Sequence, residues 1–198
     1  MSVNIMNEIH TIGHSTHPIE KFIELLSLHN ITAVCDVRSN PYSRFNPQYN
    51  RETLQKELKK HQIAYVFLGK ELGADRKVRY AELAKTALFQ DGLQRLREGI
   101  MSYRIALMCA EKDPIACHRM ILICRYLRAD DIEIKHILED GTIENNRDSE
   151  KRLAEFAKVP PPDMFESDED MILRAYHKQS EKIAHASKNK AATGGFNA

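Results

Sequence analysis

The sequence contains no tryptophan, few aromatic residues and no excess of charge of either sign. Of its 198 residues 7% are aromatic, and 29 basic against 28 acidic residues leave a formal net charge of +1. No apolar stretch approaches the roughly 18 residues that a membrane span needs. We therefore expect no membrane partner. A nucleic-acid partner would need a local basic patch, because no overall charge attracts it.

Cysteine is also scarce, with four residues at positions 35, 109, 117 and 124. The segment from Met1 to Glu8 has neither the basic region nor the apolar region of a secretory signal peptide. This pattern predicts a cytoplasmic protein whose thiols are free, metal-bound or catalytic rather than joined in a disulfide framework.

Apolar runs alternate with amphipathic stretches along most of the chain. We expect strands over residues 8–13, 32–37, 64–68, 104–110 and 133–138, and helices over residues 18–29, 50–60, 89–100, 115–127 and 146–157. Strands that alternate with helices favour parallel pairing, with helices on both faces of the sheet. The prediction is an α/β protein, a three-layer sandwich with a mostly parallel sheet of about five strands.

A run of three prolines, residues 160–162, separates this region from a carboxyl-terminal extension. We therefore predict an α/β domain over residues 1–158, a linker and helix over 159–186, and a flexible tail over 187–198. The helix, expected from Asp168 to Ala184, has its apolar residues roughly on one side. It would dock either on the core or on a second subunit of a homo-oligomer.

Reactive and charged side chains gather where the predicted strands end. At or after the end of the fourth strand stand Cys109, Glu111, Cys117, His118 and Arg119. The first strand is followed by His14 and Ser15, and Asp36, Arg38, Ser43 and Arg44 stand at or after the end of the second. In open α/β sheets ligands bind at the carboxyl ends of strands, so these side chains are expected along one edge of the sheet.

Five motifs in this order resemble the DUF488 family, from about Ile9 to about Phe156. They are Thr11-Ile12-Gly13-His14-Ser15; Asp36-Val37-Arg38 with Pro41 and Ser43-Arg44; Tyr65 with Leu68-Gly69; Cys109-Ala110-Glu111 with Cys117-His118-Arg119; and His136-Ile137 with Asp140-Gly141. The resemblance implies a compact α/β domain of bacteria and archaea, with no established activity. The chain departs from the family at Leu72-Gly73-Ala74, where the family usually has Leu-Gly-Gly.

Two kinds of role are open for the strand-end residues. Arg38, Arg44 and Arg119, with Ser15 and Ser43, would hold an anion, because a guanidinium near a helix start adds bidentate donors to a place suited to phosphate. Arg38 and Arg119 would otherwise form ion pairs with Asp36 and Glu111. The candidate chemical groups are His14, Asp36, Glu111, Cys117 and His118, acting through a thiolate or through acid–base catalysis.

The spacing of the cysteines, the histidine and the arginine gives less support to a zinc site or to a tyrosine-phosphatase loop. Cys109, Cys117 and His118 might join His14 around a metal, but the eight-residue offset of the thiols lacks the close pairing usual in zinc sites. Arg119 is two residues after Cys117 and ten after Cys109, so neither thiol begins the C-x₅-R loop of tyrosine phosphatases. We therefore assign no metal and no cofactor.

A loop from Asn40 to Asn50 interleaves aromatic residues with amides and Arg44. Such a loop could stack bases and contact phosphates. Basic residues nearby in the sequence would supply the local positive surface: Arg51, Lys56, Lys59, Lys60, Lys70, Arg76, Lys77 and Arg79. The leading hypothesis is a site for a phosphate-bearing ligand, namely an anionic small molecule, a nucleotide or a nucleic acid. The alternatives are a non-catalytic binding module with a structural ion-pair network, and a thiol-redox or metal-binding protein.

Overall fold

A six-stranded sheet forms the centre of the protein. The structure, a computed structural model, describes residues 7–74 and 78–193. The strands are β1 (Glu8–Gly13), β2 (Ala33–Asp36), β3 (Ala64–Phe67), β4 (Ile105–Cys109), β5 (Glu133–Ile137) and β6 (Ile143–Asn145), in the order β3-β2-β4-β1-β5-β6. β6 alone of these is antiparallel to its neighbour, because a turn at Gly141, with φ of 90°, reverses the chain after β5. The mostly parallel sheet is confirmed, with this one short edge strand added.

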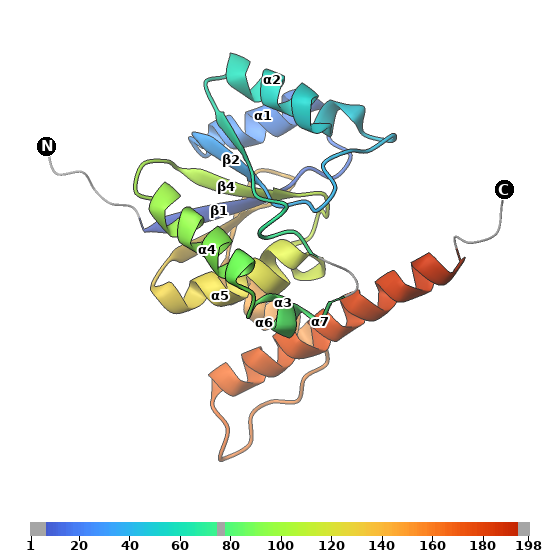
Figure 1. The fold of residues 1–198 in the computed structure, drawn as a ribbon. Coiled ribbons are helices and arrows are strands. Elements are labelled where there is room, and N and C mark those ends of the chain that lie inside the picture. Colours follow the sequence, from blue (N-terminus) through green and yellow to red (C-terminus); the bar gives the residue numbers. More distant parts are fainter. Residues whose placement is uncertain (1–6, 75–77, 194–198) are drawn as a thin grey trace, which may run out of the picture.

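Helices cover both faces of the sheet, which confirms the three-layer α/β architecture (Figure 1). α1 (Ile19–Leu28) and α2 (Arg51–Lys60) lie on one face. α4 (Ala87–Gly99), α5 (Arg125–Leu127) and α6 (Asn146–Phe156) lie on the other, where the short α3 (Tyr80–Leu83) also packs. Apolar faces on the helices and apolar side chains on both sides of the strands produce this arrangement.

Each face of the sheet has its own hydrophobic core. Successive strand residues point to opposite faces, so Val34 and Met108 enter the core beneath α1 and α2. Their neighbours Cys35 and Leu107 enter the core beneath α4, α5 and α6. The same alternation determines which side chains can meet where the strands end.

The segment after β4 differs from the single helix predicted over residues 115–127. Asp113 caps a 3₁₀ turn, Pro114–Ala116, by accepting a hydrogen bond from the backbone N–H of Ile115. Cys117 is extended, and a π-helix, Arg119–Cys124, leads into α5. All six residues of the π-helix are buried. Because all of its residues are buried, this segment has no amphipathic pattern from which its π-helical form could be predicted. π-Helices are frequent at functional sites.

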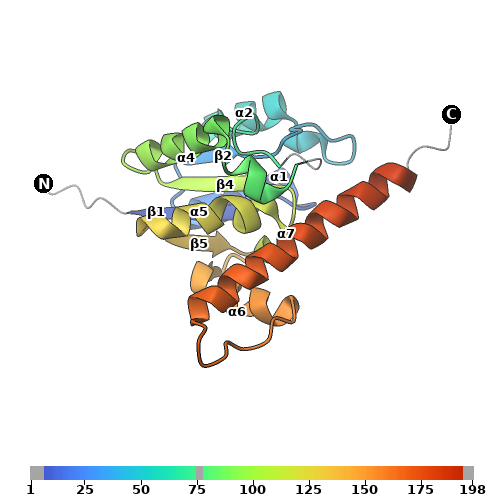
Figure 2. The same cartoon turned by 60° about the horizontal axis from the view of Figure 1, so that its bottom comes forward.

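The carboxyl-terminal helix α7 (Asp168–Thr193) docks on the core of its own chain (Figure 2). Ser167 and Asp170 form a reciprocal capping box at its start. Its inner side buries Ile172, Ala175 and Tyr176 against α6 and the π-helix. The helix is longer than predicted: the expected tail is helical as far as Thr193, and residues 194–198 lie outside the described residues.

Within the described parts of the chain, no helix combines the length and the apolar character needed to cross a membrane.

Candidate functional site

The predicted site residues lie at one edge of the sheet but fall into two clusters on its opposite faces. β1, β2 and β4 are parallel and end side by side, with Gly13 opposite Cys109 and Asp36 opposite Met108. Asp36 and Cys109 are therefore one position out of phase and point to different faces. The first cluster, beneath α1 and α2, consists of His14, Asp36, Arg38, Tyr49 and Tyr65. The thiol cluster, on the other face, consists of Cys109, Cys117 and His118.

A buried ion pair between Asp36 and Arg38 organises the first cluster. Arg38 donates from Nε to Oδ1 of Asp36 at 2.9 Å and from Nη2 to Oδ2 at 2.6 Å. Tyr65 donates its hydroxyl proton to the same Oδ2 at 2.8 Å. Burial lowers the pKa of Arg38, but the hydrogen bonds and charge of Asp36 raise it above its usual value overall. Arg38 is thus permanently charged and bound to the protein.

His14 packs flat on Tyr49, with ring centroids 4.1 Å apart. Its Nδ1 donates to the carbonyl oxygen of Ser15 at 2.9 Å, and its Nε2 accepts from Nη1 of Arg38 at 3.2 Å. Burial and the charge of Arg38 lower the pKa of His14 to about 4. The ring is neutral at pH 7 and both its nitrogens are occupied, so His14 acts as a general base only if Arg38 moves away.

The chain passes very close to itself at two glycines beside this cluster. A Cβ atom on Gly13 would lie 1.9 Å from the carbonyl oxygen of Glu111, and one on Gly73 would lie 2.2 Å from that of Gly69. The departure from the family pattern falls at Ala74, so this chain keeps glycine where the backbones approach. Gly13 allows the segment after β1 to bond the segment after β4, with the N–H of His14 donating to the carbonyl of Cys109 at 2.9 Å.

The thiol cluster brings together residues from the end of β4 and from the start of the π-helix. Nδ1 of His118 lies 3.4 Å from Sγ of Cys109 and 3.8 Å from Sγ of Cys117. Nε2 of His118 donates to the carbonyl of Val37 at 2.9 Å, which leaves Nδ1 as the unprotonated nitrogen facing both sulfurs. Relative exposures are 5% for Cys109, 1% for Cys117 and 9% for His118.

The two thiols of the cluster differ in acidity. Burial raises the pKa of Cys117, but the hydrogen bond from Cys109 and the charge of Arg119 hold it well below its usual range. The same hydrogen bond and burial raise the pKa of Cys109 well above its usual range. Cys117 is therefore the thiol that ionises, and Cys109 is the one that keeps its proton. The expected core cysteines, Cys35 and Cys124, are buried, and burial raises the pKa of both.

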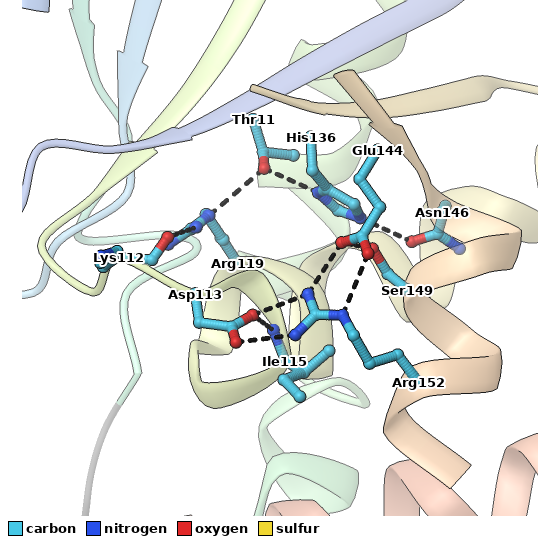
Figure 3. Close-up of polar contacts among 10 residues, drawn as sticks. All are labelled: Thr11, Lys112, Asp113, Ile115, Arg119, His136, Glu144, Asn146, Ser149 and Arg152. Atoms are coloured by element: carbon cyan, nitrogen blue, oxygen red, sulfur yellow. Dashed lines mark hydrogen bonds and ion pairs between the residues drawn. The ribbon is translucent and has the colours of Figure 1, made fainter. Parts of the chain in front are cut away.

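Arg119 holds the loop between β4 and the 3₁₀ turn (Figure 3). It has no exposed surface, and it donates to the carbonyl of Glu111 at 2.5 Å, to that of Lys112 at 2.9 Å and to the hydroxyl of Thr11 at 3.2 Å. A ligand in solution does not reach this guanidinium. Arg119 donates to the backbone carbonyl of Glu111, so the predicted ion pair with the carboxylate of Glu111 is not formed.

Sequence reasoning missed a hydrogen-bonded network that continues from Arg119 across the sheet (Figure 3). Thr11 donates to Nδ1 of the buried His136 at 2.8 Å, and Nε2 of His136 donates to Asn146 at 3.1 Å. Beside it, Arg152 donates to both Asp113 and Glu144. Thr11 and His136 each stand in one of the five motifs, but only the register of β1 with β5 places them opposite each other.

The remaining predicted residues lie nearer the surface. Glu111 and Arg44 are exposed, while Ser15 and Ser43 are half-buried. Ser43 accepts hydrogen bonds from the backbone N–H groups of Phe45 and Asn46, so its hydroxyl shapes the loop. The structure thus joins neither Glu111 nor Arg44 to either cluster.

A family model described as a domain of unknown function, DUF488, matches residues 18–126, more than half of the chain. The matched region spans α1 to α5 and includes Asp36, Arg38 and the whole thiol cluster. No curated protein and no solved structure matches the chain.

Proposed function

The chain belongs to the DUF488 family, and from its own site we propose that it binds a phosphate-bearing ligand, a single-stranded nucleic acid or a nucleotide, at the loop after β2. The observation that carries the proposal is the exposure of Phe45, whose side chain is 92% accessible in a loop that also exposes Arg44 and Tyr42. Exposed aromatic rings beside a guanidinium offer stacking to bases and charge to phosphates.

The backbone of this loop is held in place. The N–H of Ser43 donates to the side chain of Asn50 at 2.8 Å, and the hydroxyl of Tyr42 donates to Glu52 at 2.7 Å. The 3₁₀ turn Pro47–Tyr49 closes the loop, and the hydroxyl of Tyr49 donates to the carbonyl of His17 at 3.0 Å. A loop whose backbone is already ordered loses less freedom when a base stacks on one of its rings.

Arg38 supports the loop from below. Its Nη2 donates to the carbonyl of Tyr49 at 2.8 Å while it pairs with Asp36. In this proposal Arg38 positions the loop, and of the three arginines expected to hold the anion, Arg38, Arg44 and Arg119, Arg44 makes the contact.

Exposed lysines follow the loop in the sequence. Lys56 and Lys59 on α2 and Lys70 after β3 are exposed and take part in no described ion pair. Lys60 pairs with Glu57, and the predicted Arg76 and Lys77 lie outside the described residues. These lysines provide the local basic surface that the net charge of +1 does not.

Fluorescence anisotropy with a labelled oligothymidylate tests the proposal. We expect binding that weakens with salt, and both Phe45→Ala and Arg44→Ala to weaken it about tenfold, since stacking on one aromatic contributes roughly 1–3 kcal/mol. Phe165→Ala is the matched control, because Phe165 is 90% exposed on another loop. Competition with a nucleotide separates the two ligand classes. No binding by the wild-type protein, or equal losses in Phe45→Ala and Phe165→Ala, would overturn the proposal.

A binding module without chemistry is the second candidate. It is favoured by the way Arg38 and Arg119 use their nitrogens on protein atoms instead of leaving them for a ligand. In such a module Glu111→Ala would leave ligand affinity and stability unchanged, because the carboxylate is exposed and bonds nothing in the described structure.

The homo-oligomer through the carboxyl-terminal helix and the cytoplasmic location both stay predictions. The inner side of α7 is used within the chain, so a partner subunit would meet other residues, such as Met164 and Phe165 before the helix, which are 88% and 90% exposed. Light scattering of the wild-type protein and of Phe165→Ala would test this contact.

A further inference from the structure

We propose that Cys109, Cys117 and His118 form a binding site for a divalent transition metal of the zinc class, with three protein ligands and one open position. The inference does not depend on the proposed nucleic-acid site, because the two lie on opposite faces of the sheet edge.

The distances from the imidazole nitrogen to the two sulfurs match those around a tetrahedral ion. With metal–sulfur bonds of about 2.3 Å and metal–nitrogen bonds of about 2.0 Å, a tetrahedral angle separates sulfur from nitrogen by about 3.5 Å. Nδ1 of His118 lies 3.4 Å from one sulfur and 3.8 Å from the other, and the three atoms all lie within 4.8 Å of one another. An ion therefore needs only small side-chain shifts to be held by all three.

His118 is already oriented as a ligand. A metal-binding imidazole usually donates its other N–H to a carbonyl or carboxylate, which selects the tautomer and the ring direction. Here Nε2 donates to the carbonyl of Val37 at 2.9 Å, so Nδ1 carries the lone pair that faces the two sulfurs.

The charge of the site also suits a divalent cation. Two thiolates neutralise a 2+ ion, so the loaded site carries no net charge into a buried environment. Cysteine binds a metal as the thiolate, so binding would release protons from the two cysteines, and affinity would rise with pH.

Three ligands leave one coordination position to water or to a substrate. The sequence had suggested His14 as a further ligand, but its ring nitrogens face Ser15 and Arg38 on the other side of the sheet. Among the described residues, no further histidine, cysteine or carboxylate joins the group. Cys109 and His118 keep a little exposed surface. A Cys₂His set with an open position is typical of catalytic zinc.

Spacing failed to predict this site because its ligands come from two different elements. Cys109 ends β4, whereas Cys117 and His118 precede the π-helix. The loop between them is folded back by the hydrogen bonds of Arg119 to residues 111 and 112. The rival interpretation is a redox pair, in which the two thiols lose two electrons and two protons to an oxidant and form a disulfide.

Titration of the reduced, metal-free full-length protein with Co²⁺ tests the inference. We expect one Co²⁺ per chain, sulfur-to-cobalt charge-transfer absorption, the d–d bands of a tetrahedral ion, and displacement by Zn²⁺. Cys117→Ser and His118→Gln should each weaken binding at least about 100-fold, since even an outer-sphere change costs 10–100-fold. Cys35→Ser is the matched control, because it places the same change at a buried cysteine outside the cluster.

X-ray absorption on the loaded wild-type protein keeps the test independent of how the variants fold. Two sulfur neighbours and at least one nitrogen neighbour around the metal are expected. Substoichiometric Co²⁺ uptake, a cobalt spectrum without thiolate bands, or equal losses in Cys117→Ser and Cys35→Ser would overturn the metal site. A disulfide between Cys109 and Cys117 that forms in air and that Zn²⁺ does not prevent would establish the redox pair instead.

Discussion

The imidazole of His118 lies 3.4 Å from the sulfur of Cys109, although nine positions separate the two residues in the chain. The contact exists because β4 ends at Cys109 and the chain then folds back through the 3₁₀ turn Pro114–Ala116. The other nitrogen of the ring bonds the backbone just after β2. One side chain thus ties the ends of two neighbouring strands together beneath the sheet edge.

Replacing Asp36 with asparagine should destabilise the protein strongly. Asp36 has no exposed surface and Arg38 is 6% exposed, so the change leaves a buried guanidinium without its counter-charge. Breaking one side of a buried pair costs about 3–5 kcal/mol, which urea unfolding would measure. Tyr65→Phe removes only one hydrogen bond to the same carboxylate and should cost about 1 kcal/mol. Equal losses from the two changes would contradict the assigned role of the pair.

Arg119→Met should also lower stability, by about 3 kcal/mol, because it removes the donors to two loop carbonyls and to Thr11. Differential scanning calorimetry would report the loss as a lower Tm. Arg147→Ala is the control at an exposed arginine and should change stability by less than about 0.5 kcal/mol. An Arg119→Met protein as stable as the wild type would show that the guanidinium does not hold the loop.

Gly13→Ala should disrupt the edge where β1 and β4 end. The added Cβ would sit 1.9 Å from the carbonyl oxygen of Glu111, a backbone atom that cannot move without breaking its bond to Arg119. Overpacking of this kind costs about 1–3 kcal/mol or more. Ala74→Gly should cost at most about 1 kcal/mol, the usual effect of added backbone freedom. Chemical denaturation measures the free energy of unfolding of both variants. A Gly13→Ala protein as stable as the wild type would show that the backbone at Glu111 does not lie this close to Gly13.

Acid should destabilise the protein through its buried histidines. Burial lowers the pKa of His136 to about 4, whereas an unfolded histidine titrates near 6.5. Between these values the unfolded state binds more protons, so stability falls as the pH drops from about 6.5 to 4 and is unaffected by this group above that range. His10 and His14, whose pKa burial also lowers to about 4, add to the effect.

His136→Gln isolates one of these contributions. Unfolding free energies measured between pH 4 and 6.5 should depend on pH less steeply in the variant, by up to about 1.4 kcal/mol per pH unit. Parallel curves for wild type and variant would mean that His136 is not buried in its neutral form.

Local patterns predicted the elements because each reflects forces between near neighbours. The strand from Glu8 to Gly13 was predicted with its observed bounds, since its apolar residues and the glycine after them mark both ends. The segment after Cys109 was not, because a π-helix with every residue buried has no amphipathic period. The short strand β6 was not predicted, because only pairing with β5 makes its three residues a strand.

The α/β class, the parallel sheet and the edge at which polar residues gather follow from the amino-acid sequence alone, since hydrophobic periodicity and the alternation of strands with helices along the chain depend on local chemistry. Which of these residues meet depends on the register of the folded sheet. Asp36 and Cys109 lie at neighbouring strand ends but point to opposite faces, because the register places them one residue apart and side chains alternate along a strand. That single-residue offset separates the charged cluster of Arg38 from the thiols facing His118.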